Sequence, residues 1–258
     1  MEIDYILPHA LVGEQQRLAL MSKLLDPLHH RLLESVGLKK GSQCLEVGSG
    51  NGSISQWMSK RVGSSGHVVA SDIDLQYMKG LGRSNLEVRP LNILKERPEF
   101  NKYDLITARA VLHHIGNPGI GIRNMVQALK LGGALLSIEP DFLAAIATTP
   151  PPLHSFWQGW LKWSQSVGVD YFIGRKMPDL LVAAGLQEVA GEGTTEIYPG
   201  RSLWAEYWLD TIRELKDRLL ESGYISSHDL DCFERSYSDP DAWTSAITFV
   251  ATWGKRPG

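Results

Sequence analysis

QCLEVGSGNG, at residues 43–52, is a short apolar run that ends in three glycines at alternate positions. Residues 53–60 can form a helix, so the segment predicts a strand, a tight turn and a helix N-terminus. Glycine adopts positive φ without strain, and it lets a ligand approach the main chain because it has no Cβ. The start of the helix adds N–H groups that have no partner within the helix. This turn is therefore suited to holding a small ligand against its backbone.

The glycine spacing separates two classes of ligand. Dinucleotide-binding turns have the fingerprint GxGxxG. Here Gly48, Gly50 and Gly52 form GxGxG, and an acid, Glu46, precedes the first glycine by two residues. This pattern resembles motif I of the class I S-adenosylmethionine (SAM) methyltransferases. An NAD(P)-dependent oxidoreductase is the alternative, which the spacing disfavours.

Three later segments match the same family in the same order. The strand at 68–71 ends at Asp72, and a carboxylate there can accept hydrogen bonds from both hydroxyls of a ribose. NAD enzymes also have an acid at this place, so Asp72 by itself indicates a ribose. Leu91-Asn92-Ile93 follows the next strand, and residues 103–115 look like the family's fourth strand and the turn after it. The resemblance covers residues 41–139 well and the rest of the chain loosely.

The resemblance implies a SAM site made of the turn and the strand ends that follow it: Glu46, Gly48, Gly50, Gly52, Asp72, Ile73, Asn92, Ile93, Arg109 and Ala110. In this site the glycines shape the turn, Glu46 supports the methionine end and Asp72 holds the ribose. The side chain of Asn92 bonds the adenine amino group, and Ile93 packs on the ring. Arg109 and its neighbour edge the methionine moiety. Arg109 can pair with the SAM carboxylate, with a substrate acid or with a neighbouring acid, and the sequence leaves these three open.

The whole-chain composition is that of an ordinary globular protein of 258 residues. A net charge of −3 and a pI of about 6.2 imply no basic surface, which argues against a nucleic-acid substrate. Two cysteines do not make a disulfide framework. The start, MEIDYILPHA, lacks the features of a signal peptide, and no stretch approaches the ~18 apolar residues of a membrane span. We therefore expect a soluble, cytoplasmic protein with no stable membrane association.

Strand and helix patterns alternate along the chain. The expected strands lie near 43–47, 67–71, 86–89, 103–107, 133–138, 186–191 and 245–253, and the expected helices near 52–61, 74–81, 118–130 and 175–184. Such alternation implies an α/β protein with a parallel sheet and helices on both faces. Ligands bind such sheets at the carboxyl ends of the strands. Gly48, Asp72, Asn92 and Arg109 all fall there. The resemblance further implies a Rossmann-like sheet of seven strands, the last antiparallel between the fifth and sixth.

The division of the chain follows from the same plan. Residues 1–40 form an N-terminal helical segment over the active site, residues 41–141 the SAM-binding core, and residues 173–194 and 241–258 the remainder of the core. Within the first segment, Asp26-Pro27 predicts a break between two short helices, and the candidate pocket residues are Tyr5, His9 and Arg17.

Two insertions, 142–172 and 195–240, form a helical cap, and 203–220 reads as one long helix. They contain the aromatic residues Trp157, Trp160, Trp163, Tyr171, Phe172, Trp204, Tyr207 and Trp208. These side chains can be core, can line a flat apolar substrate pocket, or can form a homodimer face.

Methyl transfer from SAM is an in-line displacement, so the protein mainly aligns the reactants and excludes water. If the acceptor must lose a proton, His113 and His114 after the fourth strand and Asp141 after the fifth are the candidate bases. Catalysis without a base is the alternative. No metal site is expected, because His29-His30 and His113-His114 are adjacent pairs rather than ligand pairs with a third partner.

The sequence thus predicts a SAM-dependent methyltransferase that acts on a small apolar or aromatic molecule. It resembles the ubiquinone/menaquinone-biosynthesis type and the related tailoring enzymes of secondary metabolism. The motifs of nucleic-acid methyltransferases are missing, since residues 108–111 read ARAV where amino-methylating enzymes have Asn/Asp-Pro-Pro-Tyr. A non-catalytic SAM-binding protein of the same fold remains an alternative.

Overall fold

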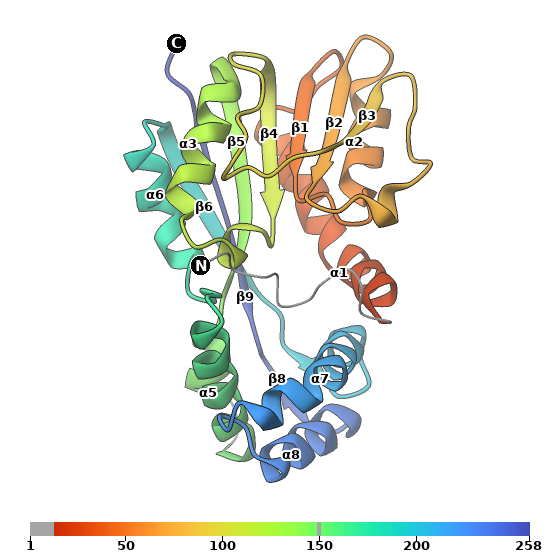
Figure 1. Cartoon of the computed structure of the whole chain (residues 1–258), viewed down its shortest axis with the longest axis vertical. Helices are drawn as coiled ribbons and strands as arrows, with labels where there is room; N and C mark the ends of the chain where they lie inside the picture. The colour runs from red at the N-terminus through yellow and green to blue at the C-terminus, as the bar shows by residue number, and fades with distance from the viewer. Residues whose placement is uncertain (1–12, 149–150) are drawn as a thin grey trace.

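A seven-stranded sheet forms the centre of the molecule (Figure 1). The computed structural model describes residues 13–148 and 151–258. In spatial order β3-β2-β1-β4-β5-β9-β6, the strands are β3 (Leu86–Pro90), β2 (His67–Asp72), β1 (Gln43–Val47), β4 (Tyr103–Arg109), β5 (Leu129–Asp141), β9 (Thr248–Lys255) and β6 (Gln187–Thr195). Strands β1 to β5 are parallel to their neighbours among themselves, whereas β9 is antiparallel to both β5 and β6. This confirms the expected α/β fold and the expected place of the last strand.

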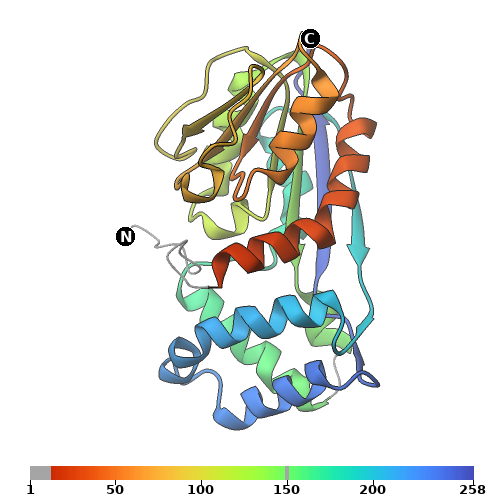
Figure 2. The ribbon, with the colours of Figure 1, turned by 90° about the vertical axis from the view of Figure 1, so that its right-hand side faces the viewer.

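Helices cover both faces of the sheet (Figure 2). They are α1 (Glu14–Ser35) and α2 (Ser53–Val62) on one face, and α3 (Pro118–Ala128) and α6 (Met177–Ala183) on the other. Successive side chains of a strand point to opposite faces. Cys44 accordingly joins the core under α1 and α2, and Leu45 joins the core under α3 and α6. The central strands β2, β1 and β4 are thus covered on both faces, and the carboxyl ends of the parallel strands remain as the place for a ligand.

A cap lies beyond the carboxyl ends of the parallel strands, where Figure 1 shows α5, α7 and α8. Its elements are α4 (Leu143–Thr148), α5 (Pro151–Ser166), α7 (Leu203–Glu221), α8 (Ser227–Ser238) and a small sheet of β7 (Tyr198–Pro199) and β8 (Trp243–Thr244). Trp157, Trp160 and Trp163 are buried within it, and the ring centroids of Trp157 and Trp208 are 5.0 Å apart. The 157-160-163 stripe is therefore core of the cap.

The N-terminal helix corrects the expectation of two short helices split at Asp26-Pro27. α1 is one helix with Pro27 inside it, and Figure 2 shows its axis bending between its two halves. Proline removes a helical hydrogen bond and crowds the preceding turn, which kinks a helix that packing holds on both sides. The buried leucines before and after the proline are Leu20, Leu25, Leu32 and Leu33. Burial of these leucines in the core outweighs the local effect of the proline.

The helix expected at 74–81 is also wrong, since the structure has one 3-10 turn there, η1 (Gln76–Met78). Aspartate side chains take the main-chain N–H groups that would begin a helix. Asp72 Oδ1 accepts from the N–H of Ile73 at 2.7 Å, and Asp74 Oδ1 accepts from that of Gln76 at 3.0 Å. Gly80 then has a φ of +81°. Such local bonds compete with helix formation.

The other expected elements agree with the structure to within a few residues, apart from the start of β5 and the end of β6. β5 begins at Leu129 rather than 133, directly after α3, and its pairing with β4 shifts register between Tyr103 and Leu105. β6 continues four residues beyond the expected end at 191. The small β7–β8 sheet places Trp243 and Thr244 with the cap, although 241–258 was expected to belong to the core.

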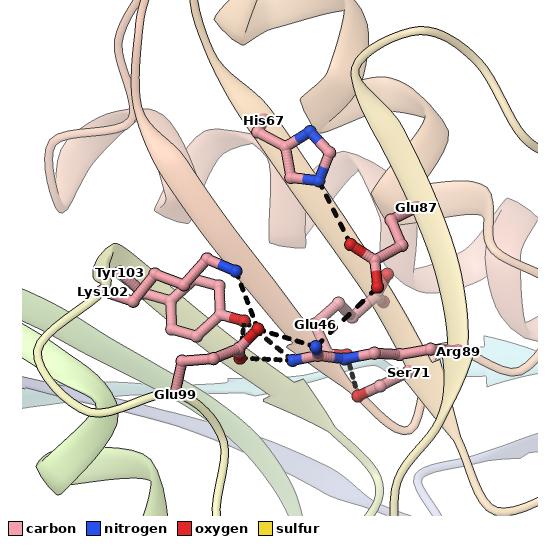
Figure 3. Close-up of polar contacts among 8 residues, drawn as sticks. All are labelled: Glu46, His67, Ser71, Glu87, Arg89, Glu99, Lys102 and Tyr103. Atoms are coloured by element: carbon pink, nitrogen blue, oxygen red, sulfur yellow. Dashed lines mark hydrogen bonds and ion pairs between the residues drawn. The ribbon is translucent and has the colours of Figure 1, made fainter.

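The connection from β3 to β4, residues 91–102, crosses one face of the sheet without forming a helix (Figure 1). Ion pairs and hydrogen bonds stabilise the end of this connection next to β4 (Figure 3). Arg89 on β3 donates to both carboxylate oxygens of Glu99, at 2.8 and 2.6 Å. Lys102 and the hydroxyl of Tyr103 each donate to the same carboxylate at 2.7 Å. The hydrogen bonds, led by those from Arg89, hold the pKa of Glu99 far below its usual range. The connection that carries Asn92 is thus anchored to the sheet.

His29, on the second half of α1, is buried against β4. Its Nε2 lies 2.7 Å from Oγ1 of Thr107, and the side chain is fully buried. Burial first, and then the charges of Arg109 and His30, lower the pKa of His29 well below 6.5. The folded protein therefore keeps His29 neutral at pH values where the unfolded chain protonates it.

This difference predicts a pH dependence of stability. As pH falls below 6.5, His29 binds a proton in the unfolded chain but stays neutral in the folded protein. His29 therefore lowers the free energy of unfolding as the pH falls. At about pH 5.5 the loss should be about 1.4 kcal/mol, or roughly 3–5 °C in Tm. In His29→Gln the amide can still bond Thr107. Between about pH 7.5 and pH 5.5, we expect the free energy of unfolding of this variant to fall by about 1.4 kcal/mol less than that of the wild type. Thermal melts at the two pH values measure this.

The control is His228→Gln, on an exposed position of α8, which should follow the wild-type pH profile. Burial raises the pKa of Glu46 to about 7, which acts in the opposite direction, because the folded protein then binds the extra proton. The comparison of variants removes this shared contribution. Identical profiles for all three proteins would contradict the role given to His29.

Candidate functional site

One cavity of about 400 Å³ opens at the carboxyl ends of the parallel strands, between the sheet, the first half of α1 and the cap. Eleven of the residues predicted for the site line it: Glu46, Gly48, Gly50, Asp72, Ile73, Asn92, Ile93, Arg109, Ala110, His113 and His114. Gly52 and Asp141 are not among the lining residues. The structure therefore brings together motifs that lie up to 68 residues apart in the chain, between Glu46 and His114.

The glycine turn is bonded to the end of β2. The N–H groups of Gly48 and Ser49 both donate to the Ser71 carbonyl, at 2.8 and 2.9 Å. Gly48 has a φ of +72°, and a Cβ built on it would lie 2.2 Å from Cγ2 of Val111. Only glycine fits this position without strain. Gly52, at a φ of +73°, is the N-cap of α2 and supports the turn from outside the cavity.

Asp72 joins the turn to the cavity. Its Oδ2 accepts from the N–H of Gly50 at 2.8 Å, and the side chain is 9% exposed. Ile73 beside it lines the cavity with 64% of its surface exposed, which is unusual for an isoleucine. A carboxylate next to an exposed apolar side chain suits a ligand with both hydroxyls and an apolar ring.

Asn92 and Ile93 form another part of the cavity wall, at the start of the β3–β4 connection. Oδ1 of Asn92 accepts from the N–H of Leu94 at 3.0 Å, so part of the predicted adenine-binding group stabilises its own turn. The side chain of Asn124 on α3 donates to the Ile93 carbonyl at 2.7 Å. This wall is consequently held from both its own turn and α3.

Glu46 is a buried acid at the floor of the cavity. It is 3% exposed, and Ser55 on α2 donates a hydrogen bond to its carboxylate. Burial raises the pKa of Glu46 to about 7, although the bond from Ser55 and the charge of Arg109 act against the rise. A cationic group of a ligand would find an acid here that ionises readily once it is paired.

Arg109 has a protein partner. Its Nη1 donates to Oδ1 of Asp26 on α1 at 2.8 Å, and both side chains are mostly buried. Ser53 donates to the same Oδ1 at 3.2 Å. Of the three alternatives that the sequence left open, the structure shows the pairing with a neighbouring acid. Arg109 ties α1 to the end of β4 while still lining the cavity.

Glu139 on β5 organises the turn after β4, a role that was not predicted from the sequence. The fully buried carboxylate accepts main-chain N–H bonds from Val111, Leu112 and His113 at 3.1, 2.9 and 3.3 Å. It also lies 2.9 Å from Nδ1 of His113. A carboxylate in this place fixes Nδ1 as the donor, which leaves Nε2 as the basic atom of a neutral ring.

The three predicted bases differ in their surroundings. Burial first, and then the charges of His113 and Arg17, lower the pKa of His114 well below its usual value. Asp141 lies outside the cavity lining, where Arg175 donates to both its oxygens at 2.6 and 2.7 Å. Burial raises the pKa of Asp141, but the bonds from Arg175 and from the N–H of Leu143 outweigh it and lower the pKa. The geometry gives no support to Asp141 as a base.

α1, β5 and the region of β9 supply lining residues that were not predicted as site residues. From α1 these are Leu18, Met21 and Ser22, and from the sheet and its approach Pro140, Ile247 and Phe249. Arg17 of the three candidate pocket residues lines the cavity, while Tyr5 and His9 fall outside the described residues. Asn51 of the turn donates to Ser22 Oγ at 3.0 Å, a polar pair that only the folded chain brings together.

The aromatic residues of the cap divide into two groups. Tyr171, Tyr207 and Trp208 line the cavity, whereas Trp157, Trp160 and Trp163 do not. Both groups come from the same insertions, so helical spacing alone could not separate them. The cavity therefore has a polar end at the glycine turn and an aromatic end at the cap.

Residues 13–148 and 151–258 contain no group of three or more His, Cys, Asp or Glu side chains arranged to hold a metal ion. In the same ranges, every helix is either too short or too polar to cross a membrane.

The sheet order, the antiparallel β9 and a cavity at the motif-bearing strand ends define the fold of the class I methyltransferases. The NAD(P)-binding alternative has a parallel sheet in the order 3-2-1-4-5-6, which lacks this antiparallel strand. The chain belongs to the methyltransferase-domain family, whose model matches residues 16–190. The resemblance drawn from the sequence motifs is confirmed.

The chain is also similar to curated proteins that are named as methyltransferases. The chain is 32% identical over 134 residues to the ubiquinone/menaquinone biosynthesis C-methyltransferase UbiE of Cellvibrio japonicus, which covers 46% of this chain and 53% of that protein. The chain thus spans about half the length of the curated relatives that it matches.

Two solved structures share the fold. Phosphoethanolamine N-methyltransferase 2 of Haemonchus contortus, in complex with phosphomonomethylethanolamine and S-adenosylhomocysteine, is 14% identical with a TM-score of 0.57, covering 95% of this chain and 53% of that one. The [4+2]-cyclase SpnF is 17% identical with a TM-score of 0.56, covering 88% of this chain and 81% of that one. At these identities the likeness concerns the fold alone.

Proposed function

We propose that this protein is a SAM-dependent methyltransferase whose acceptor is a small apolar or aromatic organic molecule. One observation carries the proposal: the residues of the SAM motifs and the aromatic residues of the cap line a single cavity. A cofactor held by Asp72 and the glycine turn would then share an enclosed space with an acceptor held by Trp208 and Tyr171. Sequestration of this kind favours group transfer over reaction with water.

The residues present fit SAM in chemistry. Asp72 offers a carboxylate to the ribose, Ile73 and Ile93 offer apolar surface to the adenine, and the buried Glu46 offers an anion to the methionine ammonium. When bound, SAM supplies an electrophilic methyl group on a sulfonium. The chain itself contributes alignment, exclusion of water and, where the acceptor must lose a proton, a base.

We propose His113 as the base for an acceptor that must be deprotonated. It lines the cavity, and its Nδ1 contact with Glu139 leaves Nε2 to accept the proton. Glu139 would then stabilise the imidazolium that forms. His114 is a weaker base because its pKa is lowered.

We also propose a role in secondary metabolism. The UbiE relative named above acts, by its name, in ubiquinone and menaquinone biosynthesis. The net charge of −3 favours a small molecule over a nucleic acid as partner.

Calorimetric titration with SAM, with S-adenosylhomocysteine (SAH) and with NADH tests the cofactor. We expect SAM and SAH to bind and NADH not to bind. Asp72→Ala removes a charged hydrogen-bond acceptor from the cavity, so SAM affinity should fall by about 1.5–3 kcal/mol, roughly ten- to hundredfold. Asp74→Ala is the matched control, because this exposed aspartate lies two residues away and outside the lining.

The outcomes separate the alternatives. Binding of NADH in place of SAM would return the turn to the dinucleotide-binding class. Binding of SAM without transfer of a labelled methyl group to any member of a panel of hydroxylated aromatic compounds would favour a non-catalytic SAM-binding protein or a different reaction. The solved cyclase that shares the fold is named for a reaction other than methyl transfer.

A further inference from the structure

Three buried side chains form a polar row where α1 meets α7 at the cavity. Arg17 is 5% exposed and Glu14 is 1% exposed. Nε and Nη2 of Arg17 each donate to the Glu14 carboxylate at 2.7 Å, and Nη1 donates to the hydroxyl of Tyr207 at 3.2 Å. Arg17 and Tyr207 line the cavity, and Tyr207 is 7% exposed. Charged side chains so well buried need a defined arrangement of partners.

Glu14 and Arg17 form a buried ion pair within this row. A two-pronged Arg–carboxylate pair is among the strongest polar contacts in proteins, and here Glu14 occupies two donor positions of Arg17. An anionic acceptor would have to compete with Glu14 for the guanidinium. The row therefore favours an acceptor that is polar and electrically neutral.

The hydroxyl of Tyr207 is directed by this pair. It accepts from Arg17, so its own proton can be donated to a further group. Within the described ranges of the chain, no hydrogen bond uses that proton. The neighbouring wall is aromatic, since Trp208 follows on α7 and its ring stands edge-on to Tyr207 at a centroid distance of 5.4 Å.

We propose that Tyr207 determines acceptor specificity by donating a hydrogen bond to an oxygen substituent on a neutral aromatic acceptor. Glu14 and Arg17 are positioning residues that hold the hydroxyl in place. The proposal rests on the proposed function for the meaning of the cavity as an acceptor site. It adds the group that would distinguish a hydroxylated ring from the bare ring and from its carboxylate.

Equilibrium dialysis with three probes tests it: 1-naphthol, naphthalene and 1-naphthoate, each with and without SAH. The wild type should bind 1-naphthol about tenfold more tightly than naphthalene, which is the effect of one buried hydrogen bond. It should bind 1-naphthoate more weakly than 1-naphthol. Tyr207→Phe should bring the ratio of naphthol to naphthalene affinity close to one. Tyr224→Phe, at an exposed tyrosine outside the lining, should keep the wild-type ratio.

A second variant tests the positioning pair. Glu14→Gln with Arg17→Met removes both charges together, so neither is left buried without its partner. The naphthol-to-naphthalene ratio should fall severalfold, while the melting temperature and SAH affinity report whether the fold and the cofactor end are intact. A structural role alone would change melting without changing the ratio.

Three results would overturn the proposal: a ratio that persists in Tyr207→Phe, a preference for 1-naphthoate, or no binding of either neutral probe. Failure of SAH to bind the wild type is a separate result, because it removes the proposed function. The series without SAH still measures the role of Tyr207 in that case.

Discussion

Gly48→Ala is expected to destabilise the protein by about 2–4 kcal/mol and to abolish measurable SAM binding. Two physical terms add. A residue with a Cβ resists the φ of +72° at this position, which costs about 1 kcal/mol. The new Cβ would also lie 2.2 Å from Cγ2 of Val111, so the turn or the chain after β4 must move. Overpacking of this kind costs about 1–3 kcal/mol.

Two further variants separate the terms, measured by urea unfolding and by SAM titration. Gly223 has the same φ of +72° as Gly48 and no atom within 4 Å of a built Cβ, so Gly223→Ala carries the cost of positive φ without a clash. Val111→Ala in the Gly48→Ala background removes the clashing methyl groups and should restore part of the stability. If Gly48→Ala costs no more than Gly223→Ala, the close approach of Val111 is not what requires glycine.

Glu139→Gln is the second substitution with a large expected effect, about 3 kcal/mol or more in the free energy of unfolding. The wild-type carboxylate accepts three main-chain N–H bonds and lies against Nδ1 of His113. An amide presents an NH₂ group to some of these donors, which leaves buried N–H groups without an acceptor. Urea unfolding measures the loss.

The matched control is Glu188→Gln, because Glu188 is exposed on β6 and makes one surface ion pair with Lys255. Surface pairs contribute little, so we expect no measurable change there. Equal effects in the two variants would mean that Glu139 does not organise the turn after β4. Glu139→Gln should also lower any activity that depends on His113, since the orientation of its ring would be lost.

Local chemistry made the glycine turn and the strand ends predictable. The turn needs positive φ at Gly48 and Gly50, and Asp72 ends the next strand, so the residue types themselves indicate the local geometry. The parallel strands then bring these ends to one edge whatever the details of the helices. This is why eleven of the thirteen predicted site residues line one cavity.

Predictions failed where distant packing decides. Pro27 indicates a helix break, yet α1 continues because leucines on both sides of the proline are buried in the core of the protein. The helix expected at 74–81 is replaced by turns that the Asp72 and Asp74 side chains stabilise. Asp141 follows β5 as a cavity residue would, but its carboxylate pairs with Arg175 instead.

The partners of charged and aromatic side chains likewise could not be predicted from the sequence. Asp26 and Arg109 are 83 residues apart, and Arg17 and Tyr207 are 190 residues apart. No local pattern connects such pairs. For the same reason the stripe 157-160-163 could not be assigned to the core of the cap, nor Tyr207 and Trp208 to the cavity, before the helices were placed.

The position of β9 has a consequence for biosynthesis. β6 is one of the two edge strands and joins the sheet through β9, which is synthesised more than fifty residues later. Until Thr248–Lys255 leave the ribosome, β5 and β6 have no strand between them, and their unpaired edges are open to other chains. The N-terminal half of the sheet can form during synthesis, but closure of the sheet must wait for release of its last strand. The nascent protein therefore passes through a stage in which chaperone protection of two open edges is most needed.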